Sequence, residues 1–133
     1  MTNRRRCLLG TKWKKIKGLT WTIGSQITST GSRVGASNSS YSSAVMASGV
    51  TVKRTGHQTD GNGINLACYV HEYKGDGSPA QTNWLRRTGL SVGSTVTLGS
   101  DCTNFRFNFA YASNSGKTMT QEIIDNYFSA EYK

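Results

Sequence analysis

The chain is poor in residue types that mark several common protein classes. Among its 133 residues there are one proline, Pro79, two histidines and seven acidic residues. Its three cysteines, Cys7, Cys68 and Cys102, are an odd number, and no two of them have the C-x-x-C spacing of a zinc or redox site. We therefore expect reduced thiols, with a Cys68–Cys102 disulfide as the minor alternative, and no metal or other cofactor.

Long apolar runs are also missing. The start of the chain is basic, but Cys7-Leu8-Leu9 is followed by Gly10 and lacks the apolar region of a signal peptide. No stretch approaches the roughly 20 apolar residues that cross a membrane as a helix. We expect synthesis in the cytoplasm without export by the usual route, and no membrane partner.

Small polar residues dominate what is present. Ser, Thr, Gly and Asn supply 56 of the 133 residues. These residues are weak helix formers but suit tight turns between short strands. The length fits one domain, and clustered aromatic and aliphatic residues argue against disorder in the body of the chain.

Alternating patterns locate the expected strands. The run 103–111 has an aromatic residue at every second position from Phe105, which predicts the central strand of the core. The run 64–73 alternates an apolar face with a face that carries Tyr69, His71 and Tyr73. Further strands are expected within 13–28 and 44–54, and around a turn at 93–94. Segments 29–43 and 55–63 are expected to be loops.

The C-terminal region has a helical period instead. Thr118 and Gln121 match a capping box, and apolar residues recur at helical spacing up to Phe128. This predicts a helix over 119–129. The fold class expected for 18–133 is all-β, an antiparallel β-sandwich that is jelly-roll-like, with one short C-terminal helix.

The first 17 residues form a second physical unit. They contain seven of the sixteen Lys and Arg residues and no acid, so we expect a basic N-terminal arm over 1–17. Three roles are open: docking to an acidic protein surface, neutralising nucleic-acid phosphates, or none. Trp13 and Ile16 interleave with the lysines, which favours docking. The expected anchoring residues are Arg4, Arg5, Arg6, Lys12, Trp13, Lys14, Lys15 and Lys17.

Catalytic patterns are weak. The acids are scattered, and only Glu72 with Asp101 are considered as a facing carboxylate pair of glycosidase type. Asp60-Gly61-Asn62-Gly63 has the texture of a calcium loop without its full set of ligands, so a plain turn is expected. We therefore expect a protein that is not an enzyme.

Four aromatic side chains are candidates for sugar contact. They are Tyr69, His71, Tyr73 and Trp84, which would form a stacking surface if their face of the sheet is exposed. The alternative is that they pack under loops or against a neighbouring subunit.

Several segments together resemble a known family. The basic start 1–6, Trp21-Thr-Ile-Gly24, the strand 104–109 and the segment 118–124 are similar to the small jelly-roll modules of tailed-phage and prophage structural proteins, themselves similar to carbohydrate-binding modules. The resemblance implies a non-enzymatic virion protein, made in the host cytoplasm, that serves as a capsid decoration, head fibre or tail-associated part. It implies a homo-oligomer with other virion proteins as partners, a host-surface glycan as a candidate ligand, and nucleic acid as an alternative partner of the arm.

Overall fold

The computed structural model describes residues 12–80 and 82–133. Their order along the chain is ten strands with a single helix near the end. The elements are β1 (Lys14–Lys15), β2 (Trp21–Ile27), β3 (Arg33–Ser42), β4 (Val45–Met46), β5 (Thr51–Gly56), β6 (Leu66–Tyr73), β7 (Trp84–Gly89), β8 (Thr95–Thr97), β9 (Asn104–Tyr111), α2 (Gln121–Tyr127) and β10 (Phe128–Tyr132).

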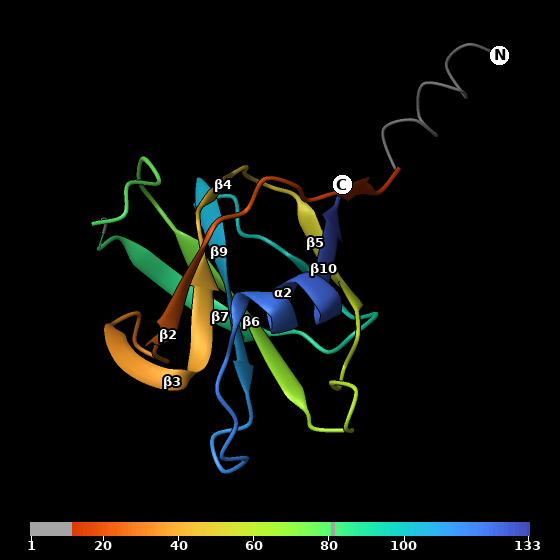
Figure 1. The fold of residues 1–133 in the computed structure, drawn as a ribbon. Helices are drawn as coiled ribbons and strands as arrows, with labels where there is room; N and C mark the ends of the chain where they lie inside the picture. Colours follow the sequence, from red (N-terminus) through yellow and green to blue (C-terminus); the bar gives the residue numbers. More distant parts are fainter. Residues whose placement is uncertain (1–11, 81) are drawn as a thin grey trace, which may run out of the picture.

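Two antiparallel sheets make up the body. The smaller sheet has the strand order β1-β10-β5-β8, and the larger sheet has the order β2-β3-β9-β6-β7 with β4 beside β9. In Figure 1, β5 and β10 of the smaller sheet lie on the right of the view, while β2 and β3 of the larger sheet lie on the left. The predicted fold class, an all-β antiparallel sandwich with one short C-terminal helix, is confirmed.

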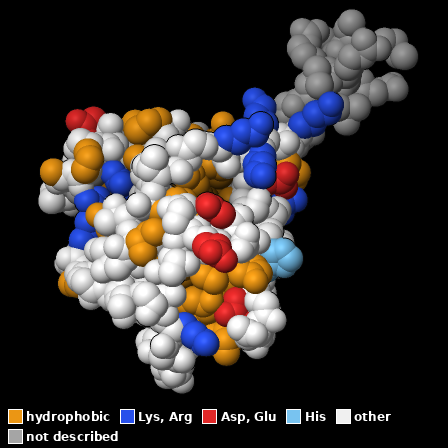
Figure 2. Space-filling model, viewed as in Figure 1, with side chains coloured by type: hydrophobic (Ala, Val, Ile, Leu, Met, Phe, Trp, Pro, Cys, Tyr) orange, Lys and Arg blue, Asp and Glu red, His pale blue; other side chains and the backbone are white. Residues whose placement is uncertain are grey.

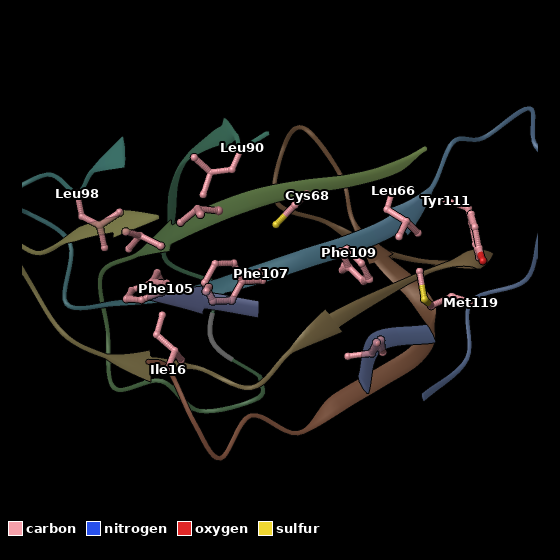
Figure 3. Packing of buried hydrophobic residues seen from close by; sticks show 14 of the residues in the cluster. Ile16, Leu66, Cys68, Leu90, Leu98, Phe105, Phe107, Phe109, Tyr111 and Met119 are labelled. Atoms are coloured by element: carbon pink, nitrogen blue, oxygen red, sulfur yellow. The ribbon is translucent and has the colours of Figure 1, made fainter. Parts of the chain in front are cut away.

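The core lies between the sheets and is built around β9. Phe105, Phe107 and Phe109 point inward from this strand and have no exposed surface, and Figure 3 shows them in a row along it. Phe128 packs edge-on against two of these rings, with centroids 5.0 Å from Phe107 and 5.3 Å from Phe109. The period-two pattern at 103–111 therefore predicted the central strand correctly.

The apolar face predicted for the strand within 64–73 is also confirmed. β6 points Leu66, Cys68 and Val70 into the core, as the alternation at 64–73 predicted. Cys68 and Cys102 are both buried and free, as expected, whereas Cys7 lies outside the described residues. Burial raises the pKa of the Cys68 thiol to about 12, so this group stays protonated and inert at neutral pH.

The prediction of a loop over 29–43 is wrong for most of that segment, because residues 33–42 form β3. The register pairs Ser39, Ser40 and Tyr41 with β9. Small side chains help to fix it, because the Ser40 hydroxyl donates to the Phe109 carbonyl at 2.8 Å and Phe107 N–H donates to the Ser42 hydroxyl at 2.9 Å. Tertiary pairing thus overrides the low strand propensity of a Ser- and Gly-rich segment.

Two expected boundaries are also corrected. The single strand over 44–54 is divided into β4 and β5, because Gly49 adopts a φ of +65° and turns the chain between them. The helix over 119–129 is shorter than predicted. It begins after Thr120, whose hydroxyl accepts from Ile123 N–H at 3.2 Å, and gives way at Phe128 to β10, which pairs with β5.

No helix in the described residues is long and apolar enough to cross a membrane.

The hairpin of β2 and β3 folds back over the outer face of the larger sheet. A register shift between Ile23 and Ser25 bends β2. Beyond it, Ile27 N–H donates to the Asn108 side chain at 2.8 Å, on the face of β9 that points away from the core. The hairpin turn reaches β7, where Gly31 lies directly against the Trp84 ring. The outer face of β9 and most of β6 is therefore covered.

The described part of the basic segment joins the smaller sheet. Lys14 pairs with Tyr132 and Lys15 with Glu131. Ile16 is buried in the core, and its N–H donates to the Ala130 carbonyl at 3.0 Å. Residues 14–16 thus belong to the sandwich. Arg4, Arg5 and Arg6 lie outside the described residues.

Candidate binding site on the larger sheet

The four aromatic residues predicted as a stacking surface lie together on the outer face of the larger sheet. Tyr69, His71 and Tyr73 project from β6, and Trp84 on β7 pairs with Tyr73. His71 and Tyr73 are buried beneath the β2–β3 hairpin, whereas Tyr69 and Trp84 are half-buried. A ligand at the surface therefore has access to Tyr69 and Trp84 but not to the two rings between them.

His71 fixes the position of the Trp84 side chain. Trp84 Nε1–H donates to His71 Nδ1 at 3.1 Å. Burial lowers the pKa of His71 to about 3, and the Arg87 charge acts in the same direction. The imidazole is therefore neutral at physiological pH and fixes the orientation of the indole.

A groove opens between the β2–β3 hairpin and the outer faces of β6 and β9. Its volume is about 530 Å³. Most of its side chains carry amide, hydroxyl or guanidinium groups, which offer both donors and acceptors. The polar lining residues include Gln26, Thr28, Asn38, Asn65, Tyr69, Arg87 and Asn108.

Arg87 and Tyr69 form the floor of this groove at one end. The Arg87 guanidinium lies 4.2 Å from the centroid of the Tyr69 ring. Among the described residues no carboxylate pairs with Arg87. Gly89 lies beside the ring, and a Cβ at that position would come within 3.4 Å of Tyr69 Cε1. The aromatic face thus carries an exposed, unpaired guanidinium.

The amide side chains of the groove are held in place by the protein itself. Asn108 Oδ1 accepts from Ile27 N–H, Asn38 Nδ2 donates to the Tyr111 carbonyl at 2.8 Å, and Asn65 Oδ1 accepts from Gln58 Nε2 at 3.0 Å. Each amide has hydrogen-bonding capacity beyond these contacts. The walls are therefore preorganised for a ligand with hydroxyl groups.

Sequence reasoning did not select Arg87. The signal was present, because Arg86 and Arg87 are adjacent in a strand and must point to opposite faces. Which of the two faces the groove depends on the register of β7 with β6, which the local sequence does not encode. The register pairs Arg87 with His71 and Arg86 with Glu72.

In the structure, the Glu72 and Asp101 carboxylates both pair with the Arg86 guanidinium. Arg86 Nη1 lies 2.6 Å from Glu72 Oε1, and Arg86 Nη2 lies 2.6 Å from Asp101 Oδ2. Gly99 N–H also donates to Glu72 Oε1, at 2.9 Å. Hydrogen bonds from Arg86 hold the pKa of Asp101 below its usual range, the opposite of what a general acid requires. This cluster resembles a structural ion bridge rather than a glycosidase pair.

Residues 60–63 form a turn that is stabilised by hydrogen bonds to the Asp60 carboxylate. Asp60 Oδ1 accepts from the N–H groups of Asn62 and Ile64 at 2.8 and 2.9 Å, and its Oδ2 accepts from the Tyr111 hydroxyl at 2.7 Å. Both carboxylate oxygens are therefore engaged within the protein. Within 12–80 and 82–133 no group of three or more His, Cys, Asp or Glu side chains is placed to hold a metal ion.

Comparison with known proteins finds no family model, no curated protein and no solved structure that matches the chain.

Proposed function

We propose that the chain is a non-enzymatic binding module that recognises a glycan in the groove between the β2–β3 hairpin and the larger sheet. The observation that carries this proposal is the Tyr69–Arg87 pair at the floor of a groove with amide walls. Sugar rings present C–H groups that pack on aromatic faces, and hydroxyls that both donate and accept hydrogen bonds. A Tyr ring beside fixed amides offers the complementary surface.

The unpaired guanidinium gives the groove a preference among sugars. Arg87 is exposed and has no carboxylate partner in the described chain. Its donors are free to bind ring hydroxyls, and they bind an acidic substituent more strongly because such hydrogen bonds are charge-assisted. A glycan with a carboxylate near the ring that packs on Tyr69 fits this arrangement best.

The test is a glycan-array screen with the full chain, followed by calorimetry on the best-binding oligosaccharide. Arg87→Gln removes the charge-assisted hydrogen bonds and is expected to weaken binding about tenfold. Lys14→Gln, which removes the same charge from the opposite sheet, is the matched control and should bind as the wild type does. Absence of binding to any glycan at millimolar concentration, or equal affinity of Arg87→Gln and the wild type, contradicts the proposal.

A second observation supports a role in attachment. Figure 2 shows Lys and Arg side chains gathered at the end of the molecule where β1 lies. Trp13 is central to this cluster, since Lys53 Nζ lies 4.2 Å and Lys133 Nζ lies 4.7 Å from its ring. Lys12, Lys14, Lys15 and Lys17 are all exposed nearby in the sequence.

We propose that this end attaches the protein to an acidic surface of another virion protein. The resemblance to small phage modules supports a virion location, in the head or the tail, with the groove directed outward. The alternative partner of the basic segment is the packaged genome, and the two are separated by an experiment described in the Discussion.

A further inference from the structure

Two guanidinium groups, those of Arg33 on β3 and Arg106 on β9, each lie against a tyrosine ring. Arg33 Cζ lies 4.9 Å from the Tyr41 ring centroid, and Arg106 Cζ lies 5.9 Å from that of Tyr73. Burial lowers the pKa of Arg106, and the Arg33 charge lowers it further. Arg106 is buried and Arg33 is half-buried, so two mutually repelling cations stand in a partly buried environment, which is unfavourable unless an anion compensates them.

The described residues provide no such anion. No salt bridge among them includes Arg33 or Arg106. Asp76, in the adjoining loop, is exposed, and its carboxylate accepts from Ser78 N–H at 3.0 Å. Arg106 donates only to neutral acceptors, the carbonyls of Ser42, Gly77 and Ser78.

Several side chains in this part of the larger sheet have unpaired polar atoms. Four buried side-chain atoms here have no hydrogen-bond partner in the structure: Arg33 Nη2, His71 Nε2, Tyr73 Oη and Arg106 Nε. His71 Nε2 is a donor like the two guanidinium nitrogens, because His71 Nδ1 accepts from Trp84 and the imidazole proton is therefore on Nε2. The Tyr73 hydroxyl is both a donor and an acceptor, and it faces Arg33. Leaving a buried donor unpaired costs about 1–3 kcal/mol, so an acceptor that binds beside Arg33 offsets part of this cost.

A cleft of about 420 Å³ gives access to Arg33. Arg33 and Trp84 line it, together with the hydroxyl-bearing residues Thr30, Ser32 and Thr82. Arg33 Nη1 donates to the Pro79 carbonyl. A carbonyl is a weaker acceptor than an oxyanion, so an anion in the cleft can replace this contact with a stronger one.

We propose that this cleft is a binding site for a small oxyanion. Arg33 is the group that contacts the anion, and Arg106 supplies a second positive charge from beneath. The ligand is a carboxylate, sulfate or phosphate group, free or carried on a larger molecule. The lining of the cleft shares no residue with the glycan groove, and the site does not depend on that groove.

The test is a titration of the ¹⁵N-labelled full chain with sodium sulfate, compared with sodium chloride at equal ionic strength. Saturable shifts are expected for the amides of 30–33 and 82–84 and for the Trp84 indole. Arg33→Gln should weaken sulfate binding about tenfold or more. Lys117→Gln, an equal charge loss at an exposed position, should leave it unchanged.

A second set of probes identifies the source of the anion. Glucuronate and glucose differ in one carboxylate, so shifts with glucuronate alone assign the site to acidic sugars, and shifts with sulfate alone assign it to sulfate or phosphate groups. Arg33→Lys keeps the charge without the planar fork and should weaken binding by a smaller factor; it replaces Arg33→Gln if that variant does not fold. No saturable shift with either anion, or equal shifts in wild type and both Arg33 variants, overturns the proposal.

Discussion

Single buried residues determine which parts of this sandwich are open. Arg54 is the clearest case, because it has no exposed surface and donates to the carbonyls of Leu90, Leu66 and His57 at 2.9, 2.8 and 3.2 Å. These bonds join β5 to β6 and to the segment after β7. Burial lowers the pKa of Arg54. A cation in this position closes one end of the core with hydrogen bonds where an apolar side chain would leave carbonyls unpaired.

Gly31 is a second residue with a large effect. Its φ is +84°, and a Cβ there would lie 2.5 Å from Trp84 Cγ. Gly31→Ala is therefore expected to destabilise the fold by about 3 kcal/mol, from backbone strain together with the clash. Chemical denaturation measures the loss.

Gly24 provides the matched control for this substitution. It has the same φ of +84°, but a Cβ there would meet nothing within 4 Å. Gly24→Ala should cost about 1 kcal/mol, from backbone strain alone. Equal losses in the two variants would show that the hairpin does not press on Trp84 and would weaken the account of how the outer face is covered.

At the scale of the element, strands with a strict period of two were predictable and the others were not. The aromatic alternation of 103–111 specifies both the strand and its buried face, because exposure of either face would leave several rings in water. Segment 33–42 has no such pattern, and its pairing with β9 depends on partners far along the chain. Its curvature over the larger sheet, which makes both candidate sites, was therefore not predictable from local sequence.

Helix α2 also shows that local sequence does not fix every feature of an element. The predicted capping box of Thr118 with Gln121 is wrong, because the helix is capped by Thr120 and Gln121 is its first residue. Thr120→Ala is expected to reduce stability by about 1 kcal/mol, because Ile123 N–H loses its partner. Thr118→Ala should change it by less than about 0.5 kcal/mol, as is usual for an exposed position. Thermal unfolding followed by circular dichroism compares the two, and the reverse order would mean that the helix begins earlier.

At the scale of the whole molecule, composition correctly identified the basic N-terminal segment but did not show where the folded body begins. The basic character of residues 1–17 is evident from composition, yet residues 14–16 are part of the smaller sheet. Among the aromatic residues chosen as a binding surface, only Tyr69 and Trp84 reach a groove or cleft. The hairpin that buries His71 and Tyr73 is a tertiary feature, so alternation placed the residues on one face without showing that it is covered.

Two truncations separate attachment from folding. Deletion of 1–11 removes Arg4, Arg5 and Arg6 but leaves β1, Ile16 and the lysines around Trp13, so it should keep the melting temperature and reduce incorporation into particles without abolishing it. Deletion of 1–17 also removes the buried Ile16 and should cost about 3 kcal/mol of stability. Normal incorporation after deletion of 1–11 would exclude docking through these arginines. Binding of the wild type to DNA that falls steeply with salt, and is lost on this deletion, would assign the segment to the genome instead.

The pairing of β1 with β10 also has a mechanical consequence. A pull on the N-terminal segment reaches the fold at Lys14 and Lys15, which are bonded to β10, and at Ile16 in the core. The load is therefore taken up by the smaller sheet. A load applied through the N-terminal segment therefore meets the smaller sheet before it reaches the larger one.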